Sequence, residues 1–343
     1  MITPEQKEQI KSQNQDKARR QDNKQHCQKI LEGIGRFDDN TASRAVWELL
    51  QNARDLSKHA HVKIELDEDK LVFSHNGEPF NYDTFTSLIK QVSSEEKEDP
   101  NAAGQFGTGF MTTHKFSRKI RIDGSMKITE NEFAPIEGFV LDRTATEIQD
   151  MINAMVDQLR YADELVDKPT VPDPSPETTF TYFLDEDHYP AAKQGVDNAI
   201  DLLPYVMTIN NRIEQVEVTG SKVGNAVKMV KEGWALIDRD VNLYEVTIRI
   251  NDKDRKKYYY LQSEDKKDIV ILPLEDINKA CKLGDIPRFF IYFPLLGTQN
   301  FGLNYIFHSE RFYPEEPRNA IVLPEDNIDK KVKYETNVAV LNE

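Results

Sequence analysis

The feature that most constrains this chain is a glycine-rich stretch, GQFGTGF, at residues 104–110. Gly104, Gly107 and Gly109 give it the spacing G-x-x-G-x-G, and the segment FMTTHKF that follows can be helical. A glycine loop that leads into a helix presents backbone N–H groups and the positive end of the helix dipole to an anion. Such a loop is more often an ordinary turn, so its meaning depends on the residues that accompany it.

An earlier segment, residues 41–58, has the pattern of an amphipathic helix capped by Thr41 or Ser43. Its apolar positions form one face: Val46, Leu49, Leu50, Ala53 and Leu56. At about 100° per residue, Glu48, Asn52 and Asp55 fall in one stripe away from the centre of that face. The stripe is either an ordinary solvated helix face or a set of carboxylate and amide oxygens presented to a ligand.

Further signals lie between these two segments. Strand patterns at 61–66 and 70–75 lead to the turn His75-Asn76-Gly77. A second helix pattern at 82–92 then runs into SSEEKEDPNAAG, a polar segment of small residues that is suited to a mobile lid.

The rest of the chain indicates a mixed α and β protein. We expect strands in KIRIDG and EGFVLD, a helix over 144–166 whose Met151 and Met155 serve core packing, and a strand in TTFTYFL. We expect a further helix that starts at Ala191 and ends at Pro204. Five strand patterns follow, in IEQVEVTG, NLYEVTIRIND, KKYYYLQSE, DIVILPL and RFFIYFP, and the last segment begins like a helix, which suggests that the protein continues beyond it.

With 343 residues the chain is long enough for two cores. The proline-rich segment KPTVPDPSPE and the strand after it indicate a boundary near residue 188. We therefore predict a polar, partly helical extension at 1–35, a first domain at 36–188 and a second domain at 189–343.

Charge and cysteine content exclude several classes of protein. The net charge of -15 disfavours nucleic acid as a partner, because phosphate backbones are bound by clustered Lys and Arg. Cys27 and Cys281 are too few for a disulfide framework and favour a reducing cytosol. The polar N-terminus is unlike a secretory signal, and no apolar run reaches a membrane-spanning length. We expect a soluble cytoplasmic protein with no membrane partner.

Three motifs now form an ordered set: ELLQNARD, HNGEPF and GQFGTGF. In that order they resemble the N box and the two glycine boxes of the GHKL ATPases, the superfamily of gyrase, heat-shock chaperones of the ninety-kilodalton class, histidine kinases and MutL. The resemblance covers residues 40–187, and the glycine box is closest to the chaperone form. HNGEPF, the SS-containing segment and FGLNYIFHSERFYPEEPRNAI are most similar to bacterial relatives of the sacsin N-terminal ATPase module.

The resemblance implies an α+β Bergerat fold: a two-layer α/β sandwich whose mixed, mostly antiparallel sheet has helices on one face, followed by a second α/β domain of transducer or middle type. It also implies that Glu48 is the general base for a water molecule, that Asn52 gives an oxygen to Mg²⁺ and that Asp55 supports them. The implied ATP and Mg²⁺ contacts are Asn52, Asp55, His75, Asn76, Gly77, Gly104, Gln105, Phe106, Gly107, Thr108, Gly109, Phe110 and either Thr178 or Thr179.

His75 departs from the superfamily, which has an aspartate there to accept a hydrogen bond from the adenine amino group. A neutral imidazole can accept one such bond and a protonated one cannot. His75 is then either the adenine acceptor, with Asn76 or a water sharing the task, or a strand-end histidine satisfied by a neighbour. The first alternative predicts weaker nucleotide binding below about pH 6.

The resemblance implies a magnesium-dependent ATPase of low turnover in a chaperone-like or conformational-switch protein, with nucleotide ordering the lid. Expected partners are ATP and ADP, a second copy in a homodimer, and a protein client. The alternative is a nucleotide sensor with little turnover. A histidine kinase is disfavoured because His26 lies in a polar stretch without an apolar dimerisation stripe, and a topoisomerase or repair role is disfavoured by the charge. No basic residue of the second domain is assigned to the γ-phosphate.

Overall fold

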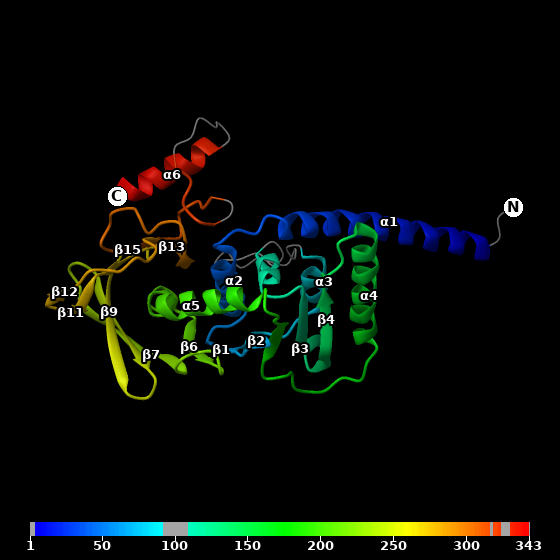
Figure 1. Cartoon of the computed structure of the whole chain (residues 1–343), viewed down its shortest axis with the longest axis horizontal. Coiled ribbons are helices and arrows are strands. Elements are labelled where there is room, and N and C mark those ends of the chain that lie inside the picture. The colour runs from blue at the N-terminus through cyan, green and yellow to red at the C-terminus, as the bar shows by residue number, and fades with distance from the viewer. Residues whose placement is uncertain (1–3, 92–108, 316–317, 324–329, 343) are drawn as a thin grey trace. The chain divides into compact units, whose positions relative to one another are not determined.

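The structure is a computed structural model that describes residues 4–91, 109–315, 318–323 and 330–342, with backbone alone for residues 4–16, 18 and 19 (Figure 1). Its fold is α+β, with a large mixed sheet and helices. The helices are α1 (Pro4–Ile34), α2 (Thr41–Asp55), α3 (Tyr82–Lys90), the 3-10 helix η1 (Phe110–Lys115), α4 (Ile148–Val166), α5 (Tyr189–Ile209) and α6 (Lys331–Asn342). The strands are β1 (Ala60–Leu66), β2 (Lys70–His75), β3 (Lys119–Thr129), β4 (Glu132–Asp142), β5 (Thr178–Phe183), β6 (Ile213–Thr219), β7 (Val227–Asp238), β8 (Leu243–Ile250), β9 (Asp254–Gln262), β10 (Asp268–Leu272), β11 (Leu274–Asp276), β12 (Lys279–Ala280), β13 (Phe289–Ile291), β14 (Phe293–Pro294) and β15 (Ile306–Ser309).

The chain divides into two compact units. The first comprises Met1–Asn52 and Glu68–Ala192, and the second comprises Ala53–Asp67 and Lys193–Glu343. The chain passes from the first to the second unit near the expected boundary at 188, and an earlier segment, 53–67, also belongs to the second unit. Helix α2 therefore starts in the first unit and ends in the second.

The first unit has a sheet with the order β2-β5-β3-β4, in which every neighbouring pair is antiparallel. Helix α3 packs against β3, and α4 packs against β4 and α3. The core between them contains Phe85 of α3, whose ring lies 5.0 Å from that of Phe139 of β4. Met151 and Met155 of α4 are fully buried, which confirms that they serve core packing.

Helix α1 is longer than the short terminal helix expected from the sequence, since it begins at Pro4. Its second half buries a stripe at helical spacing: Asn23, Cys27, Ile30 and Ile34. This half contacts α3, α4 and η1. At Gly33 the approach to η1 is so close that an added Cβ would lie 1.9 Å from the sulfur of Met111. A larger residue here would displace the Met111 side chain from its present position.

The second unit has a sheet with the order β14-β13-β15-β10-β9-β8-β7-β6-β1. This sheet is mixed, because β1 pairs with β6 in parallel and β13 with β15 in parallel, whereas the other pairs are antiparallel. Strands β11 and β12 form a separate ribbon.

The expectation that a helix ends at Pro204 is wrong. Helix α5 contains Pro204 and continues to Ile209. Proline costs a helix about 3 kcal/mol through its missing N–H and its ring. Four apolar side chains around it are buried, which offsets that cost: Leu202, Leu203, Val206 and Met207. The side chain of Thr208 also donates a hydrogen bond to the Pro204 carbonyl, at 2.8 Å.

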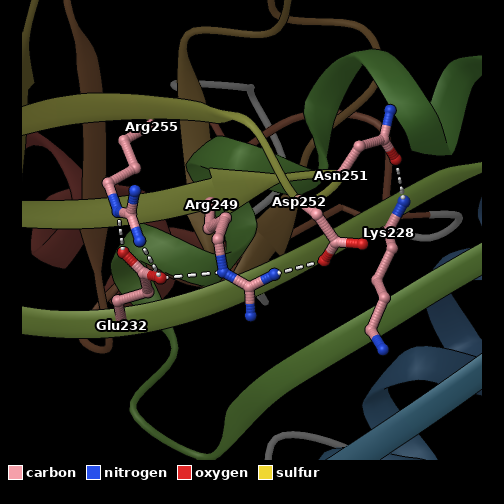
Figure 2. A network of polar contacts seen from close by, with 6 residues as sticks. All are labelled: Lys228, Glu232, Arg249, Asn251, Asp252 and Arg255. Carbon is pink, nitrogen blue, oxygen red and sulfur yellow. Dashed lines mark hydrogen bonds and ion pairs between the residues drawn. The ribbon is translucent and has the colours of Figure 1, made fainter.

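Strand β7 was not expected from the sequence. Its pairing with β8 shifts register between Lys231 and Gly233, so its side chains do not alternate strictly along the strand. Figure 2 shows what occupies this irregular stretch: Glu232 accepts hydrogen bonds from Arg249 of β8, at 2.8 Å, and from Arg255 of β9, at 2.7 Å. Exposed cross-strand ion pairs of this kind add little stability each.

Among the described residues, no helix is both long and apolar enough to cross a membrane.

Candidate functional site

Helix α2 carries the first expected group of site residues. Asp38 and Thr41 hold its start, because the Thr41 hydroxyl donates to the Asp38 carboxylate and accepts from the Asp38 N–H. The expected apolar positions Val46, Leu49, Leu50 and Ala53 are all buried. Glu48 is half-buried and Asn52 is 8% exposed, one turn further along. The helix thus places a carboxylate and an amide side by side at the margin of its buried face.

Asp55, the third residue of the stripe, differs from the other two because it belongs to the second unit. Its carboxylate accepts a hydrogen bond from Arg54 at 2.8 Å, and both side chains are 5% exposed. The Arg54 guanidinium in turn lies 3.8 Å from the centre of the Tyr292 ring. Asp55 is therefore oriented by its own neighbour in a buried ion pair of the second unit.

Gly109, the last glycine of the glycine-rich stretch, lies directly against Glu48. A Cβ atom built on Gly109 would be 2.0 Å from Glu48 Oε2 and 2.6 Å from the carboxyl carbon. A Cβ at that distance would displace the Glu48 carboxylate, so glycine is what lets the backbone lie against the carboxylate in its present position. The fold has brought together two motifs that are far apart in the sequence.

The remaining glycine-box positions lie outside the described residues: Gly104, Gln105, Phe106, Gly107 and Thr108. The expected lid segment, residues 93–104, lies there as well. Beyond Gly109 the segment expected to be helical is the six-residue 3-10 helix η1. Both the N–H and the hydroxyl of Thr112 donate to the Gly109 carbonyl, at 3.0 and 2.7 Å. These bonds fix the carbonyl side of Gly109 in the first turn of η1.

A row of buried rings connects η1 to the first glycine box. Phe110 lies 5.6 Å from Phe180 of β5, and Phe180 lies 6.1 Å from His75 in a stacked arrangement. His114 of η1 contacts the other side of Phe110 edge-on, at 6.4 Å. The two glycine boxes are thus joined through side chains of the first unit's core.

His75 ends strand β2 and is 2% exposed. Its Nδ1 accepts a hydrogen bond from the Gly77 N–H at 3.0 Å. Burial lowers the pKa of His75 to about 4, so the ring is neutral at neutral pH. In a neutral imidazole whose Nδ1 accepts, Nε2 carries the proton and can only donate. The ring therefore holds the Gly77 turn, in which Asn76 and Gly77 are half-buried, and has no acceptor left for an adenine amino group.

The two candidate threonines of β5 lie on opposite faces of the sheet, as adjacent strand residues do. Thr178 is buried and pairs with His75 across the β2–β5 ladder. Thr179 pairs with Ser74, and the two hydroxyls are 3.0 Å apart. Thr178 is therefore the threonine that shares a face with His75, Phe180 and Phe110.

Among the described residues, no group of three or more His, Cys, Asp and Glu side chains is arranged to hold a metal ion. Mg²⁺ does not require one, because it keeps several waters and binds through one or two protein oxygens together with substrate phosphates. Asn52 and Glu48 offer such oxygens, and the Glu48 carboxylate lies against the backbone of Gly109. The residues present fit Mg²⁺ held mainly by a bound nucleotide.

Sequence reasoning missed a second set of buried polar residues beside η1: Gln91, His114 and Arg143. His114 follows the glycine box closely enough to have attracted attention, whereas nothing in the local pattern singles out Gln91 or Arg143. Arg311, a basic residue of the second unit, forms an ion pair with Asp268.

In comparisons with known proteins, no family model matches the chain and no curated protein matches it either.

Proposed function

We propose that the first unit is a GHKL-type ATP-binding module with the Bergerat fold, which binds MgATP and hydrolyses it slowly. The observation that carries the proposal is the contact between Gly109 and the Glu48 carboxylate. A glycine backbone that approaches a half-buried carboxylate beside an amide is what a phosphate site with its own general base requires. The order of the three motifs along the chain supports the same function.

In this proposal Glu48 acts on a water molecule aligned with the γ-phosphate. The water oxygen forms a bond to the γ-phosphorus, the bond from that phosphorus to the β–γ bridging oxygen breaks, and the water proton passes to the Glu48 carboxylate. Asn52 contributes an oxygen on the metal side. Mg²⁺, when bound, neutralises charge on the phosphate oxygens.

The adenine end of the site is proposed to lie near the turn that His75 holds. Because Nδ1 of His75 already accepts from Gly77, Asn76 or a bound water is the better acceptor for the adenine amino group. Thr178, on the same face as His75, is the threonine we assign to the hydrogen bonds around the base. Protonation of His75 would break its bond from the Gly77 N–H, so acidification should weaken nucleotide binding through this turn only near pH 4.

We propose that turnover is slow. A slow cycle suits a chaperone-like or conformational-switch protein of the cytoplasm, in which nucleotide drives rearrangement of domains or subunits and ADP is the product. The rearrangement would alter contacts within a homodimer or with a protein client.

The proposal is tested by measuring how fast the variant Glu48→Gln releases phosphate from MgATP. Glutamine keeps the shape of the side chain and removes its basicity, so we expect turnover to fall by about 100-fold to 10,000-fold with ATP affinity retained. The matched control is Glu164→Gln, an exposed glutamate of α4, which should match the wild type.

Equal turnover in wild type and Glu48→Gln, with nucleotide bound by both, would contradict hydrolysis by Glu48 and favour the nucleotide sensor. Absence of ATP binding at millimolar concentration would contradict the whole assignment.

A further inference from the structure

Helix α3 ends in an unusual way. Gln91, the residue after its last turn, adopts a left-handed conformation with φ 54° and ψ 50°. Glycine or asparagine is usual there, because a longer side chain costs about 1 to 2 kcal/mol in this region. Gln91 is nevertheless buried, with 4% of its surface exposed. Because the left-handed conformation of Gln91 is unfavourable, we expect a contact of its side chain that offsets the cost.

The Gln91 side chain forms a hydrogen bond with His114. His114 lies in η1 and is 2% exposed. His114 Nδ1 lies 3.2 Å from the Ser117 carbonyl, and a carbonyl can only accept, so Nδ1 carries the proton. Nε2 is then the acceptor and receives the bond from the Gln91 amide nitrogen. With the amide nitrogen facing Nε2, this pairing requires a neutral His114.

The surroundings keep His114 neutral. Burial, together with the positive charges of Arg143 and Arg118, lowers the pKa of His114 to about 3. Arg143 is fully buried, and its hydrogen-bond acceptors in the described part of the chain are the carbonyls of Ile89 and Asp142 and the amide oxygen of Gln158. The titratable groups of Cys27 and Asp142 also act electrostatically on Arg143. Burial raises the pKa of Cys27 to about 11, so Cys27 is neutral too.

Arg143 also ties this cluster to α3, since Ile89 lies in the last turn of that helix, two residues before Gln91. From His114 the contacts continue to Gly109: the His114 ring meets Phe110 edge-on, and Thr112 holds the Gly109 carbonyl. Gly109 in turn lies against Glu48. All of these residues belong to the first unit.

We propose that the Gln91–His114 hydrogen bond, backed by Arg143, is a neutral clasp that fixes Gly109 beside Glu48, so that Gln91 and His114 are positioning residues for the proposed hydrolysis. The inference rests on the proposed function for its catalytic consequence. Its structural content, that the clasp holds the Gly109 end of η1, can be measured without nucleotide.

The first test is amide hydrogen exchange of residues 109–115 in the nucleotide-free chain. Gln91→Ala removes one buried hydrogen bond and should speed exchange there by about threefold to tenfold. The same variant should lower kcat/KM for MgATP by a similar factor, chiefly through kcat. Gln149→Ala, an exposed glutamine of α4, is the matched control and should change neither quantity. Unchanged exchange in Gln91→Ala would overturn the clasp.

Gln91→Glu gives a readout that a merely structural role would not produce. A carboxylate beside His114 raises the pKa of the imidazole, so that a Glu–imidazolium pair restores the clasp at low pH, whereas at high pH two acceptors face each other. The protection factors of residues 109–115, which correct for the pH dependence of intrinsic amide exchange, should therefore rise, and kcat should rise, as the pH falls from about 8 to about 6. The wild type should show no such trend, and the same absence in Gln91→Glu would overturn the proposal.

A measurement on the wild type covers the case in which the variants do not fold. Imidazole nitrogen shifts from NMR should show the Nδ1–H tautomer of His114 with no titration between about pH 5 and pH 8. Titration of His114 in that range would overturn the neutral clasp. Failure of the wild type to hydrolyse ATP would instead remove the proposed function, and the exchange rates would still test the clasp.

Discussion

The two sides of the candidate site are built in different ways. On one side the half-buried carboxylate of Glu48 faces the backbone of Gly109, at a distance that no side chain allows. On the other side His75 is fully enclosed, neutral, hydrogen-bonded to Gly77 and stacked on Phe180. The first arrangement sets a carboxyl group against a glycine backbone, which suits chemistry. The second gives shape to a turn, which suits recognition of a flat ring.

Gly109→Ala should have the largest effect on this contrast. Gly109 has φ -67° and ψ -48°, which alanine adopts easily, so the substitution acts only through its collision with Glu48. Displacement of either group by about 1 Å should lower kcat for MgATP by about 100-fold. Gly35→Ala is the control, because its Cβ would meet nothing nearer than 3.4 Å.

Adding Glu48→Ala to Gly109→Ala removes the collision, so the double variant should bind ATP with the affinity of Glu48→Ala alone. Normal turnover in Gly109→Ala would mean that the contact has no part in the reaction.

His75→Asn tests the other side through pH. The pKa of His75 is held near 4 in the folded chain by burial, below its ordinary value of 6.5. Its contribution to stability is therefore complete above about pH 6.5 and is lost as the pH falls toward 4, because the unfolded chain binds the proton first. Each such proton gives a slope of about 1.4 kcal/mol per pH unit.

Urea denaturation at a series of pH values measures that slope. On the acid side, the free energy of unfolding of His75→Asn should depend on pH less steeply than that of the wild type, by about one proton. The pKa of His114 is also lowered by burial, so His114 should contribute to the slope in both proteins. An unchanged slope would show that His75 is not the buried neutral group described above.

The smallest predicted effect separates the two threonines of β5. Thr178→Val removes the hydroxyl on the His75 face and should weaken ATP binding by about threefold to tenfold. Thr179→Val removes the hydroxyl that pairs with Ser74 on the opposite face and should leave ATP affinity unchanged. Calorimetric titration with ATP measures both. The reverse order of effects would assign the base-side threonine to Thr179.

The sequence predicted α2 and its buried face well, because Val46, Leu49, Leu50 and Ala53 repeat at a period that only a helix shares. It also placed β2, β5 and the Met151 and Met155 core correctly. These features depend on residues that are close together in the chain.

Features that depend on long-range packing were not predictable. Helix α5 continues past Pro204 because surrounding apolar side chains are buried, and β7 is hidden by a register shift that breaks its alternation. Spacing alone could suggest that Glu48 and Gly109 serve one site, but it could not reveal their contact. The pairing of Gln91 with His114 leaves no periodic signal, since each residue ends or follows a different helix.

A crystal structure with a non-hydrolysable ATP analogue and Mg²⁺ tests the central claim most directly. We predict phosphate density beside Gly109 and Glu48, with the metal within bonding distance of the Asn52 side-chain oxygen, at about 2.0 to 2.1 Å. Empty density there at millimolar nucleotide, or nucleotide bound away from these three residues, would contradict the account and leave Gly109 as part of an ordinary turn.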